Sequence, residues 1–176
     1  MTSWCGLAYW ELRERVGPQY DVTDRVVHVF QNLPHGDGMC LSQMQVTNSN
    51  TPKDVLPTRD KIGAGVTLSL ERDAGVWLYN RSKHDVFVNS PTLEAFETRT
   101  ATVYKVPSGY SLQIFDFERS ELVHRIRNSR QSSQQHAEGP YDAYSVRISF
   151  VKGWGRDYRR QFITSCPCWL EVRINR

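Results

Sequence analysis

The chain has 176 residues, of which 39% are hydrophobic and 23% charged, and its formal net charge is +3 at pH 7. This length fits one domain, and the apolar share is too high for a disordered chain. No apolar run is long enough to span a bilayer and no basic leader precedes one, so we expect neither membrane insertion nor secretion. Four cysteines are too few for a disulfide scaffold, and inside a cell they would stay reduced.

Apolar and polar residues alternate with a period of two along much of the chain, which indicates half-buried β-strands separated by Gly, Pro and Asn turns. The expected strands, in chain order, are 66–71, 76–79, 85–88, 102–106, 110–114, 146–150 and 170–174. The first two are joined by a short turn at 72–75 and predict a β-hairpin. Short strands with such turns predict a mainly β chain, folded as an antiparallel β-sandwich.

Two segments depart from this period. Between Asp116 and Arg130 the apolar residues fall at helical spacing, Asp116 can cap the start, and acidic residues precede basic ones, as the helix dipole favours. A shorter helix can form between Asp54 and Ile62, with its length limited by Pro57. The polar stretch near 128–139 predicts a flexible loop.

The usual catalytic and cofactor motifs are absent from the sequence. There is no Gly-x-Ser-x-Gly elbow, no His-Glu-x-x-His and no phosphate-binding Gly-rich loop. A catalytic triad whose residues lie far apart in sequence and meet only in the folded chain is an alternative that the sequence does not exclude. Cys166 and Cys168 stand one residue apart, which is not a zinc-knuckle spacing, and Cys5 and Cys40 supply no second pair. We therefore expect no enzyme, no cofactor and no metal, and we interpret the cysteines as buried free thiols.

The segment from Ser149 to Gln161 contains the strongest functional signal. An expected strand leads into Gly153-Trp154-Gly155, whose glycines permit a sharp excursion of the backbone. Positions 147 to 160 contain five basic residues and one acidic residue, a local charge of +4 that exceeds that of the whole chain. Arginine forks, a lysine charge and the Tyr158 hydroxyl suit recognition of a phosphate. The alternative is a solvated basic loop without a ligand.

The motif Lys152-Gly-Trp-Gly, followed by Tyr158, Arg160-Gln161 and Pro167-Cys168-Trp169, resembles the third long loop of the C-terminal Mad-homology domain of Smad proteins. The resemblance runs in order through nearly the whole chain. Further matching segments are 4–11, 15–17, 61–65 and 105–110. Three segments resemble the inhibitory branch of the family, of which an insect member is a candidate: 77–81, 162–168 and 174–176.

The resemblance implies a single domain over residues 1–176. Its implied fold is a forkhead-associated-like β-sandwich with a loop-helix face at one end and a reduced helical bundle at the other. In that family the loop-helix face binds phosphoserine. The implied phosphoserine-binding and receptor-binding residues are Lys152, Tyr158, Arg159 and Arg160, with Arg59 and Lys61 extending the basic groove. The residues implied in the architecture of the loop are Gly153, Trp154 and Gly155.

The implied partners are phosphorylated type I receptors of the TGF-β/BMP class, phosphorylated activating Smads and common Smads. Activating Smads have a terminal helix and a Ser-x-Ser tail, which this sequence lacks after Arg176, so we expect a mostly monomeric, competitive inhibitor of signalling. Ubiquitin ligases and corepressors would bind through regions outside this chain, and no direct DNA binding is expected. The expected location is the cytoplasm and the nucleus.

Two points stay open at this stage. The segment from Arg156 to Arg159 resembles the activating branch more than the inhibitory one, which leaves receptor preference undecided. The alternative function is a nuclear corepressor or adaptor module that acts through an apolar face around Trp4, Tyr9 and Trp10.

Overall fold

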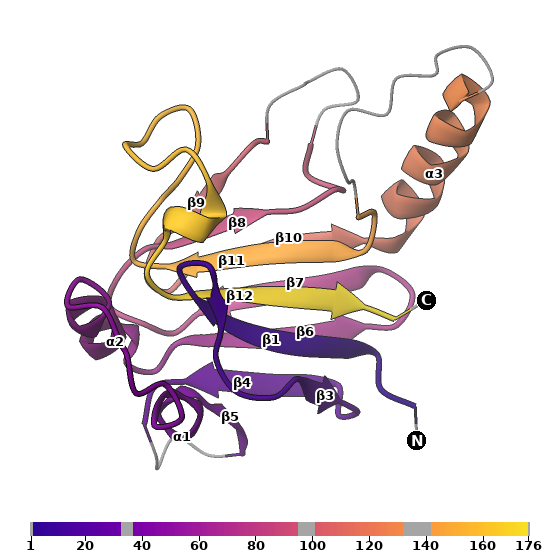
Figure 1. Ribbon diagram of the computed structural model, residues 1–176. Coiled ribbons are helices and arrows are strands. Elements are labelled where there is room, and N and C mark those ends of the chain that lie inside the picture. The colour runs from indigo at the N-terminus through magenta and orange to yellow at the C-terminus, as the bar shows by residue number, and fades with distance from the viewer. Residues whose placement is uncertain (1, 33–36, 95–100, 132–141, 176) are drawn as a thin grey trace.

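The computed structural model describes residues 2–32, 37–94, 101–131 and 142–175, and two β-sheets pack face to face in it (Figure 1). The strands of the first sheet are β1 (Cys5–Glu11), β2 (Glu14–Arg15), β3 (Tyr20–Val22), β8 (Val86–Asn89), β9 (Tyr104–Val106), β11 (Ser145–Phe150) and β12 (Trp169–Ile174). Their order across the sheet is β2-β1-β12-β11-β8-β9, and β3 pairs with β1. The mainly β class predicted from the sequence is confirmed.

The second sheet lies behind the first in Figure 1. Its strands are β4 (Val26–Phe30), β5 (Gly38–Cys40), β6 (Val66–Glu71), β7 (Gly75–Asn80) and β10 (Ser111–Asp116), in the order β10-β7-β6-β4-β5. Strands β4 and β5 run parallel, whereas β4, β6, β7 and β10 pair antiparallel with their other neighbours. The sandwich is therefore antiparallel apart from one short edge pair.

Helices lie at both ends of the sandwich (Figure 1). They are α1 (Leu41–Gln45), α2 (Leu56–Ile62), α3 (Phe117–Gln131) and the 3-10 helix η1 (Ile163–Ser165). Helices α1 and α2 lie at the end where the loop between β11 and β12 projects, and α3 lies at the opposite end, where both termini are found. This places loops and two helices together at one end of the sandwich.

The core lies between the two sheets and follows the alternation of side chains along each strand. Leu68 and Leu78 of β6 and β7, and Ile148 and Leu170 of β11 and β12, are fully buried, with 0% exposure. Their neighbours in sequence point to the opposite face of each sheet. Burial of large apolar side chains in two facing layers is the main term that holds the sheets together, at about 25 cal/mol per Å² of apolar area.

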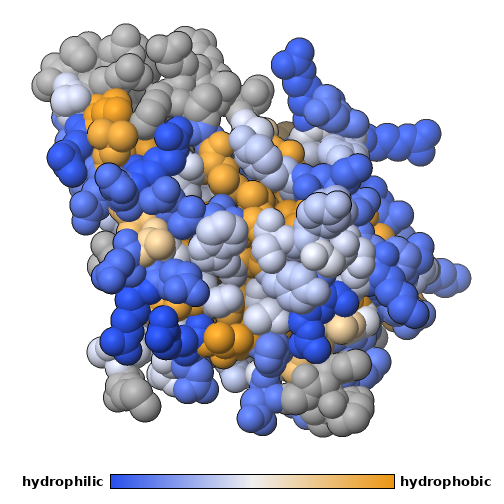
Figure 2. All heavy atoms as spheres, turned by 180° about the vertical axis from the view of Figure 1, so that it is seen from behind, coloured by the Kyte–Doolittle hydropathy of each residue, from blue (hydrophilic) through white to orange (hydrophobic). Residues whose placement is uncertain are grey.

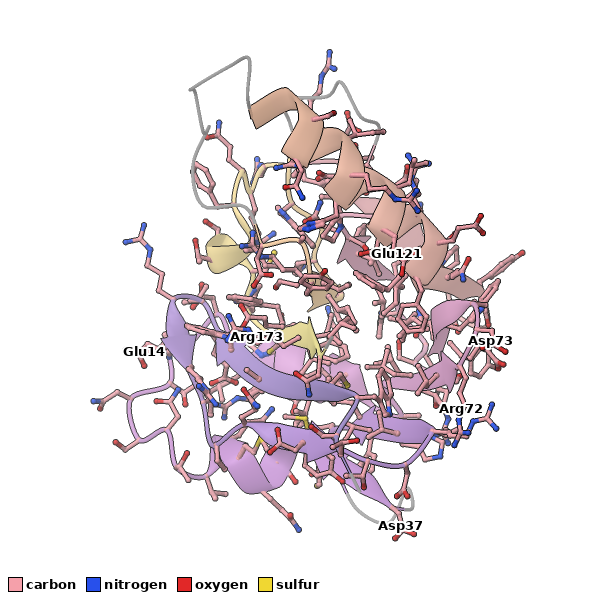
Figure 3. The ribbon with its side chains drawn as sticks, turned by 90° about the vertical axis from the view of Figure 1, so that its right-hand side faces the viewer. Glu14, Asp37, Arg72, Asp73, Glu121 and Arg173 are labelled. Atoms are coloured by element: carbon pink, nitrogen blue, oxygen red, sulfur yellow. The ribbon has the colours of Figure 1, made fainter. Side chains whose placement is uncertain are left out.

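The outer face of the second sheet remains open to solvent. Figure 2 shows the molecule from this side, where side chains of intermediate hydropathy gather near the centre. On β7, Trp77 and Tyr79 are 40% and 42% exposed and lie on the face that points away from the core. Figure 3 shows the two layers from the end that contains α3, with Glu14 of the first sheet and Arg72 and Asp73 of the β6–β7 turn on opposite sides.

The strand and helix predictions are largely confirmed. The predicted hairpin is β6 and β7, paired from Val66 with Asn80 to Glu71 with Gly75. The predicted long helix is α3, and the carboxylate of Asp116 accepts a hydrogen bond from the backbone N–H of Arg119 (3.1 Å), as a capping residue should. The short helix is α2, in which Pro57 lies in the first turn, where a missing N–H costs nothing. The helix begins at Leu56 rather than Asp54, so it is shorter than the predicted span, as expected from a proline that cannot continue the helix toward the N-terminus.

Some expectations differ from the structure. The flexible loop predicted near 128–139 is wrong for residues 128–131, which continue α3, and residues 132–139 lie outside the described residues. Strands β1 and β4 were not predicted from alternation, because their sequences are nearly continuous apolar runs. In β1 the five residues from Cys5 to Tyr9 are all buried, so the period of two disappears.

A buried polar network joins β1 to the helices at the loop end. Glu11, 2% exposed, accepts hydrogen bonds from Nε and Nη2 of Arg59 on α2, both at 2.5 Å. The same carboxylate accepts one from the Tyr9 hydroxyl (2.7 Å) and one from the Asn48 amide (3.1 Å). Gln45 of α1 donates to the Tyr9 hydroxyl at 3.1 Å. Because the carboxylate is paired and fully hydrogen-bonded, its burial is tolerated, and β1, α1 and α2 are held in one arrangement.

This network generates a stability prediction. Replacing Glu11 by Gln removes the charge that faces Arg59 and leaves a partly buried guanidinium, 13% exposed, without its counter-ion. We expect Glu11→Gln to lower the free energy of unfolding by about 3 kcal/mol, the scale for breaking one partner of a buried ion pair. Urea unfolding followed by far-ultraviolet circular dichroism measures the change. Glu14→Gln, at an exposed position three residues away, should change it by less than about 0.5 kcal/mol. Equal values for the two variants would contradict the role of the pair.

Candidate functional site

The loop between β11 and β12 is fixed to the outer face of the first sheet by an apolar cluster of its own. Trp154, Ile163 and Cys166 from the loop are buried against Phe87 of β8 and Trp169 of β12. Trp10 of β1 stacks on Trp169, with ring centroids 5.1 Å apart and an interplanar angle of 12°. Because this cluster is separate from the core between the sheets, the loop has its own packed base and does not depend on solvent-exposed contacts.

The backbone of the loop turns sharply where the sequence supplies glycine. Gly155 has a φ of +98°, in the region that favours glycine, and its N–H donates to the Arg160 carbonyl at 2.7 Å. A Cβ atom at Gly153 would lie 2.8 Å from the ring of Tyr158, so only glycine leaves room for that ring. These two positions bring the chain back on itself and place the basic residues of the loop near one another.

Lys152, Arg159 and Arg160 line one cavity of about 680 Å³, which we call the basic cavity. Its other lining residues are Gln161, Phe162 and Ser165, so it has three cationic side chains and no carboxylate. Nε of Arg160 donates to the carbonyl of Ser165 at 3.1 Å, which orients the guanidinium and leaves its two NH₂ groups for other acceptors. A cavity with these charges attracts an anion, and arginine forks bind phosphate oxygens in pairs.

The other residues predicted for the site lie outside this lining. The Tyr158 ring packs edge-to-face on Phe87, with centroids 5.2 Å apart, and is 40% exposed. Arg59 binds Glu11 and also donates to the Thr51 hydroxyl at 3.0 Å, so much of its hydrogen-bonding capacity is used. Lys61 is exposed on α2. The structure thus brings together Lys152, Arg159 and Arg160, and the phosphoserine-binding role of all six predicted residues stays a prediction.

Gln161, Phe162 and Ser165 were not among the predicted site residues. Phe162 is 66% exposed although it is a large apolar side chain. The sequence offered one signal, since Phe162 and Ser165 belong to the segment 162–168 that resembles the inhibitory branch. Their position beside the basic residues depends on how the loop folds over η1, which residue spacing alone does not give.

The apolar face proposed around Trp4, Tyr9 and Trp10 does not form. Tyr9 has 0% exposure and points into the core, because successive side chains of β1 alternate between the two faces of the sheet. Trp10 points to the other face and is stacked on Trp169. Trp4 packs against the core and donates from its indole nitrogen to the Asp24 carbonyl at 2.7 Å. These three residues therefore stabilise the fold and do not present a common binding face.

The cysteines are buried and free. Burial raises the pKa of the Cys168 thiol to about 12. It also raises the pKa of the Cys166 thiol, with Ser149 and Arg160 opposing this effect. Within the described residues, no group of three or more His, Cys, Asp or Glu side chains is placed to hold a metal ion. In the same residues, no helix is long and apolar enough to cross a membrane.

The chain is a β-sandwich domain in which one loop, packed on the outer face of the first sheet, gathers cations at the end of the sheets. The MH2 domain family matches residues 2–175, and the chain belongs to this family of Smad signalling domains. It is 52% identical over 172 residues to Mothers against decapentaplegic homolog 6 of Gallus gallus and 45% identical to homolog 7 of Homo sapiens. Each match covers 98% of this chain and 38% of the relative, so the chain spans well under half of their length.

Both relatives are inhibitory Smads, so the resemblance to the inhibitory branch is confirmed. Two solved structures share the fold at low sequence identity. A chain from "Crystal Structure of STAT2 in complex with IRF9" aligns with a TM-score of 0.58 at 13% identity, over 98% of this chain and 92% of that one. The Interferon Regulatory Factor 9 IAD domain aligns with a TM-score of 0.59 at 11% identity, over 98% and 83%. The β-sandwich architecture is therefore shared beyond the family.

The buried thiols generate a prediction about reactivity. Since the thiolate is the reactive form, raising the thiol pKa lowers the rate of alkylation at any pH below it. We expect Cys168 in the folded protein at pH 8 to react with iodoacetamide at least about 100-fold more slowly than in urea, and Cys166 to react more slowly than in urea. Mass spectrometry after timed quenching measures both rates. Metal analysis of the same sample should find no stoichiometric zinc, and zinc that resists mild chelation, or rapid alkylation of the folded chain, would contradict this interpretation.

Proposed function

We propose that this chain is an inhibitory Smad module that binds phosphoserine in the basic cavity. Its targets are phosphorylated type I receptors of the TGF-β/BMP class or the phosphorylated activating Smads, and it blocks signalling by competing for them. The observation that supports this most directly is that Lys152, Arg159 and Arg160 line one cavity without a carboxylate. Membership of the MH2 family and similarity to inhibitory Smads supply the signalling context.

The chemistry of the cavity suits a phosphorylated side chain. Phosphoserine has a charge of about −1.5 to −2 at pH 7 and three acceptor oxygens. Arg160, oriented through its bond to Ser165, can present a planar pair of donors, while Lys152 supplies a point charge from the start of the loop. Arg159 adds a third charge to the same lining. Arg160 is therefore partly positioned before the anion arrives, which reduces the entropy that this side chain loses on binding.

Inhibition by competition follows because two MH2 domains cannot bind the same phosphoserine at once. A phosphoserine held in this cavity cannot at the same time enter the basic loop of another MH2 domain, so inhibition depends on concentration and affinity. Binding to receptors places this activity in the cytoplasm, and binding to activated Smads extends it to the nucleus. Ubiquitin ligases and corepressors belong to the same proposal as partners of regions outside this chain.

The first test compares two forms of one peptide. A doubly phosphorylated type I receptor peptide and its unphosphorylated counterpart are titrated into the protein by isothermal calorimetry. We expect the phosphorylated form to bind at least about 10-fold more tightly, since one charge-assisted hydrogen bond is worth about 1.5–3 kcal/mol. Equal binding of the two forms would refute phosphoserine recognition.

The second test separates a positioned cavity from a solvated basic loop. We expect Arg160→Ala and Lys152→Ala each to weaken phosphopeptide binding by more than about 1 kcal/mol, since each removes a charge-assisted donor. Arg156→Ala is the matched control, because Arg156 is exposed on the same loop, is not part of the cavity lining and neighbours Asp157. Its effect should be smaller, as for an exposed, partly compensated charge.

The salt dependence of phosphopeptide affinity is a second measurement on the same three variants. Binding to the unmodified protein should weaken as salt rises, because charges in an open cavity are screened over about 10 Å at 0.1 M. The variants of Arg160 and Lys152 should lose part of this dependence, whereas the Arg156 variant should keep it. Small, equal effects of all three substitutions at low and high salt would end the phosphate-binding hypothesis.

A further inference from the structure

A second cavity lies at the same end of the molecule and differs in chemistry from the first. It has a volume of about 330 Å³ and is formed by the β1–β2 turn, the segment around Asn50 and Thr164 of η1. The surface exposed inside it is mainly apolar, with Leu12 and Pro52 as apolar walls. We call it the apolar cavity. Its volume is at the lower end of the range for pockets that hold small ligands, about 300–1,000 Å³.

The charges around the apolar cavity compensate one another. The Glu11 carboxylate borders it but is already bound to Arg59, Tyr9 and Asn48. Arg13 and Glu14, adjacent in the turn, have opposite charges and are both exposed. The cavity therefore offers no free buried charge to an ion, in contrast to the basic cavity with its three cations. The group that fits it is neutral and apolar.

The linings of the two cavities meet in helix η1, where two adjacent residues belong to different cavities. Thr164 lines the apolar cavity, and Ser165 lines the basic cavity. Consecutive Cα atoms are about 3.8 Å apart, and an extended peptide advances about 3.3 Å per residue. Side chains two to four residues apart on one extended peptide lie about 7–13 Å apart, and a peptide that crosses this boundary can place one side chain on each side of it.

The spacing between the cavities is fixed by hydrogen bonds. The backbone N–H of Leu12 donates to the Cys166 carbonyl at 3.1 Å. The indole nitrogen of Trp169 donates to the Leu12 carbonyl at 2.9 Å. These bonds tie the β1–β2 turn, one wall of the apolar cavity, to the segment that follows η1. A ligand that occupies both cavities must therefore have its apolar group and its phosphate separated by the distance between the two cavities.

We propose that the apolar cavity binds a leucine-sized apolar side chain located two to four residues from the phosphoserine of the same peptide. The inference rests on the proposed function, because it assigns the anion to the basic cavity. The apolar cavity would then choose among phosphorylated segments that the basic cavity binds equally well. Specificity comes from burying one apolar side chain, and affinity for phosphate comes from the charges.

The experiment uses a set of phosphopeptides that differ in one position. Each peptide has one phosphoserine in an alanine-rich background, with a single leucine placed at each position from four before to four after it. Calorimetry gives the affinity for the unmodified protein. We expect leucine at one position, two to four residues from the phosphoserine, to raise affinity at least about fivefold over the alanine parent, since full burial of such a side chain is worth about 1.5–3 kcal/mol.

Variants that fill the apolar cavity test whether the affinity gained from leucine arises there. Asn50→Trp fills the apolar cavity from an exposed position, and Glu14→Trp does so from the opposite wall. Both should abolish the leucine gain and leave the affinity for the alanine phosphopeptide within about twofold. Ser49→Trp is the matched control, since Ser49 is an exposed neighbour that does not line the cavity, and it should keep the gain. Circular dichroism checks that each variant is folded.

The outcomes distinguish this inference from the function on which it rests. If the alanine phosphopeptide binds but no leucine position improves it, the apolar subsite is refuted and phosphoserine binding stands. A leucine gain that survives both Asn50→Trp and Glu14→Trp places the contact elsewhere and also refutes the subsite. If neither the alanine phosphopeptide nor any leucine variant binds, the proposed function itself fails, and the inference fails with it.

Discussion

The ion pair between Glu11 and Arg59 is the interaction on which the loop-and-helix end of the molecule depends. It joins a central strand of the first sheet to α2, and through Tyr9, Gln45 and Asn48 it also fixes α1 and the segment that follows it. A charge that is 2% exposed can be kept in this place only because every partner is present at once. The arrangement of helices and loops at this end is therefore cooperative, since no member of the network can move without exposing or orphaning another.

The same end must also accommodate three cations in one cavity. Like charges at short range repel, and a mobile loop would relieve that repulsion by spreading its side chains. The cluster of Trp154, Ile163 and Cys166 beneath the loop, with Trp169 as its base, opposes such spreading. Positive charge is thus concentrated by apolar packing on the other side of the backbone. This explains why a basic segment contains buried tryptophan and glycine at fixed positions.

The sequence predicts features that depend on neighbours along the chain. Alternation from Val66 to Asn80 predicts the β6–β7 hairpin, and the clustering of Lys152, Arg159 and Arg160 predicts the basic site, since all three lie on one loop. Features that join distant segments are not predicted. Glu11 and Arg59 stand 48 positions apart, and nothing in their spacing marks them as a pair. The sequence therefore predicts Arg59 as part of the phosphate groove and does not reveal that it is paired with Glu11.

A strand that is buried on both faces is also difficult to predict from sequence, because its apolar and polar residues do not alternate. In β1 all residues from Cys5 to Tyr9 are buried, because the strand is covered on both sides, so the sequence does not reveal which side chains point to the core. Where no strand is recognised, the sequence predicts one face for Tyr9 and Trp10, whereas as neighbours in β1 they point to opposite faces. The apolar cavity is formed by three segments far apart in sequence, and only the folded chain brings Leu12, Asn50 and Thr164 together.

The stacked indoles of Trp10 and Trp169 also have an optical consequence. Two aromatic rings held 5.1 Å apart and nearly parallel couple electronically, and Trp154 belongs to the same cluster under the loop. Three of the five tryptophans therefore sit behind one loop and outside the main core. The near-ultraviolet dichroism and intrinsic fluorescence of this chain thus include a contribution from the order of the loop. The protein contains its own spectroscopic label at the surface where ligands would arrive.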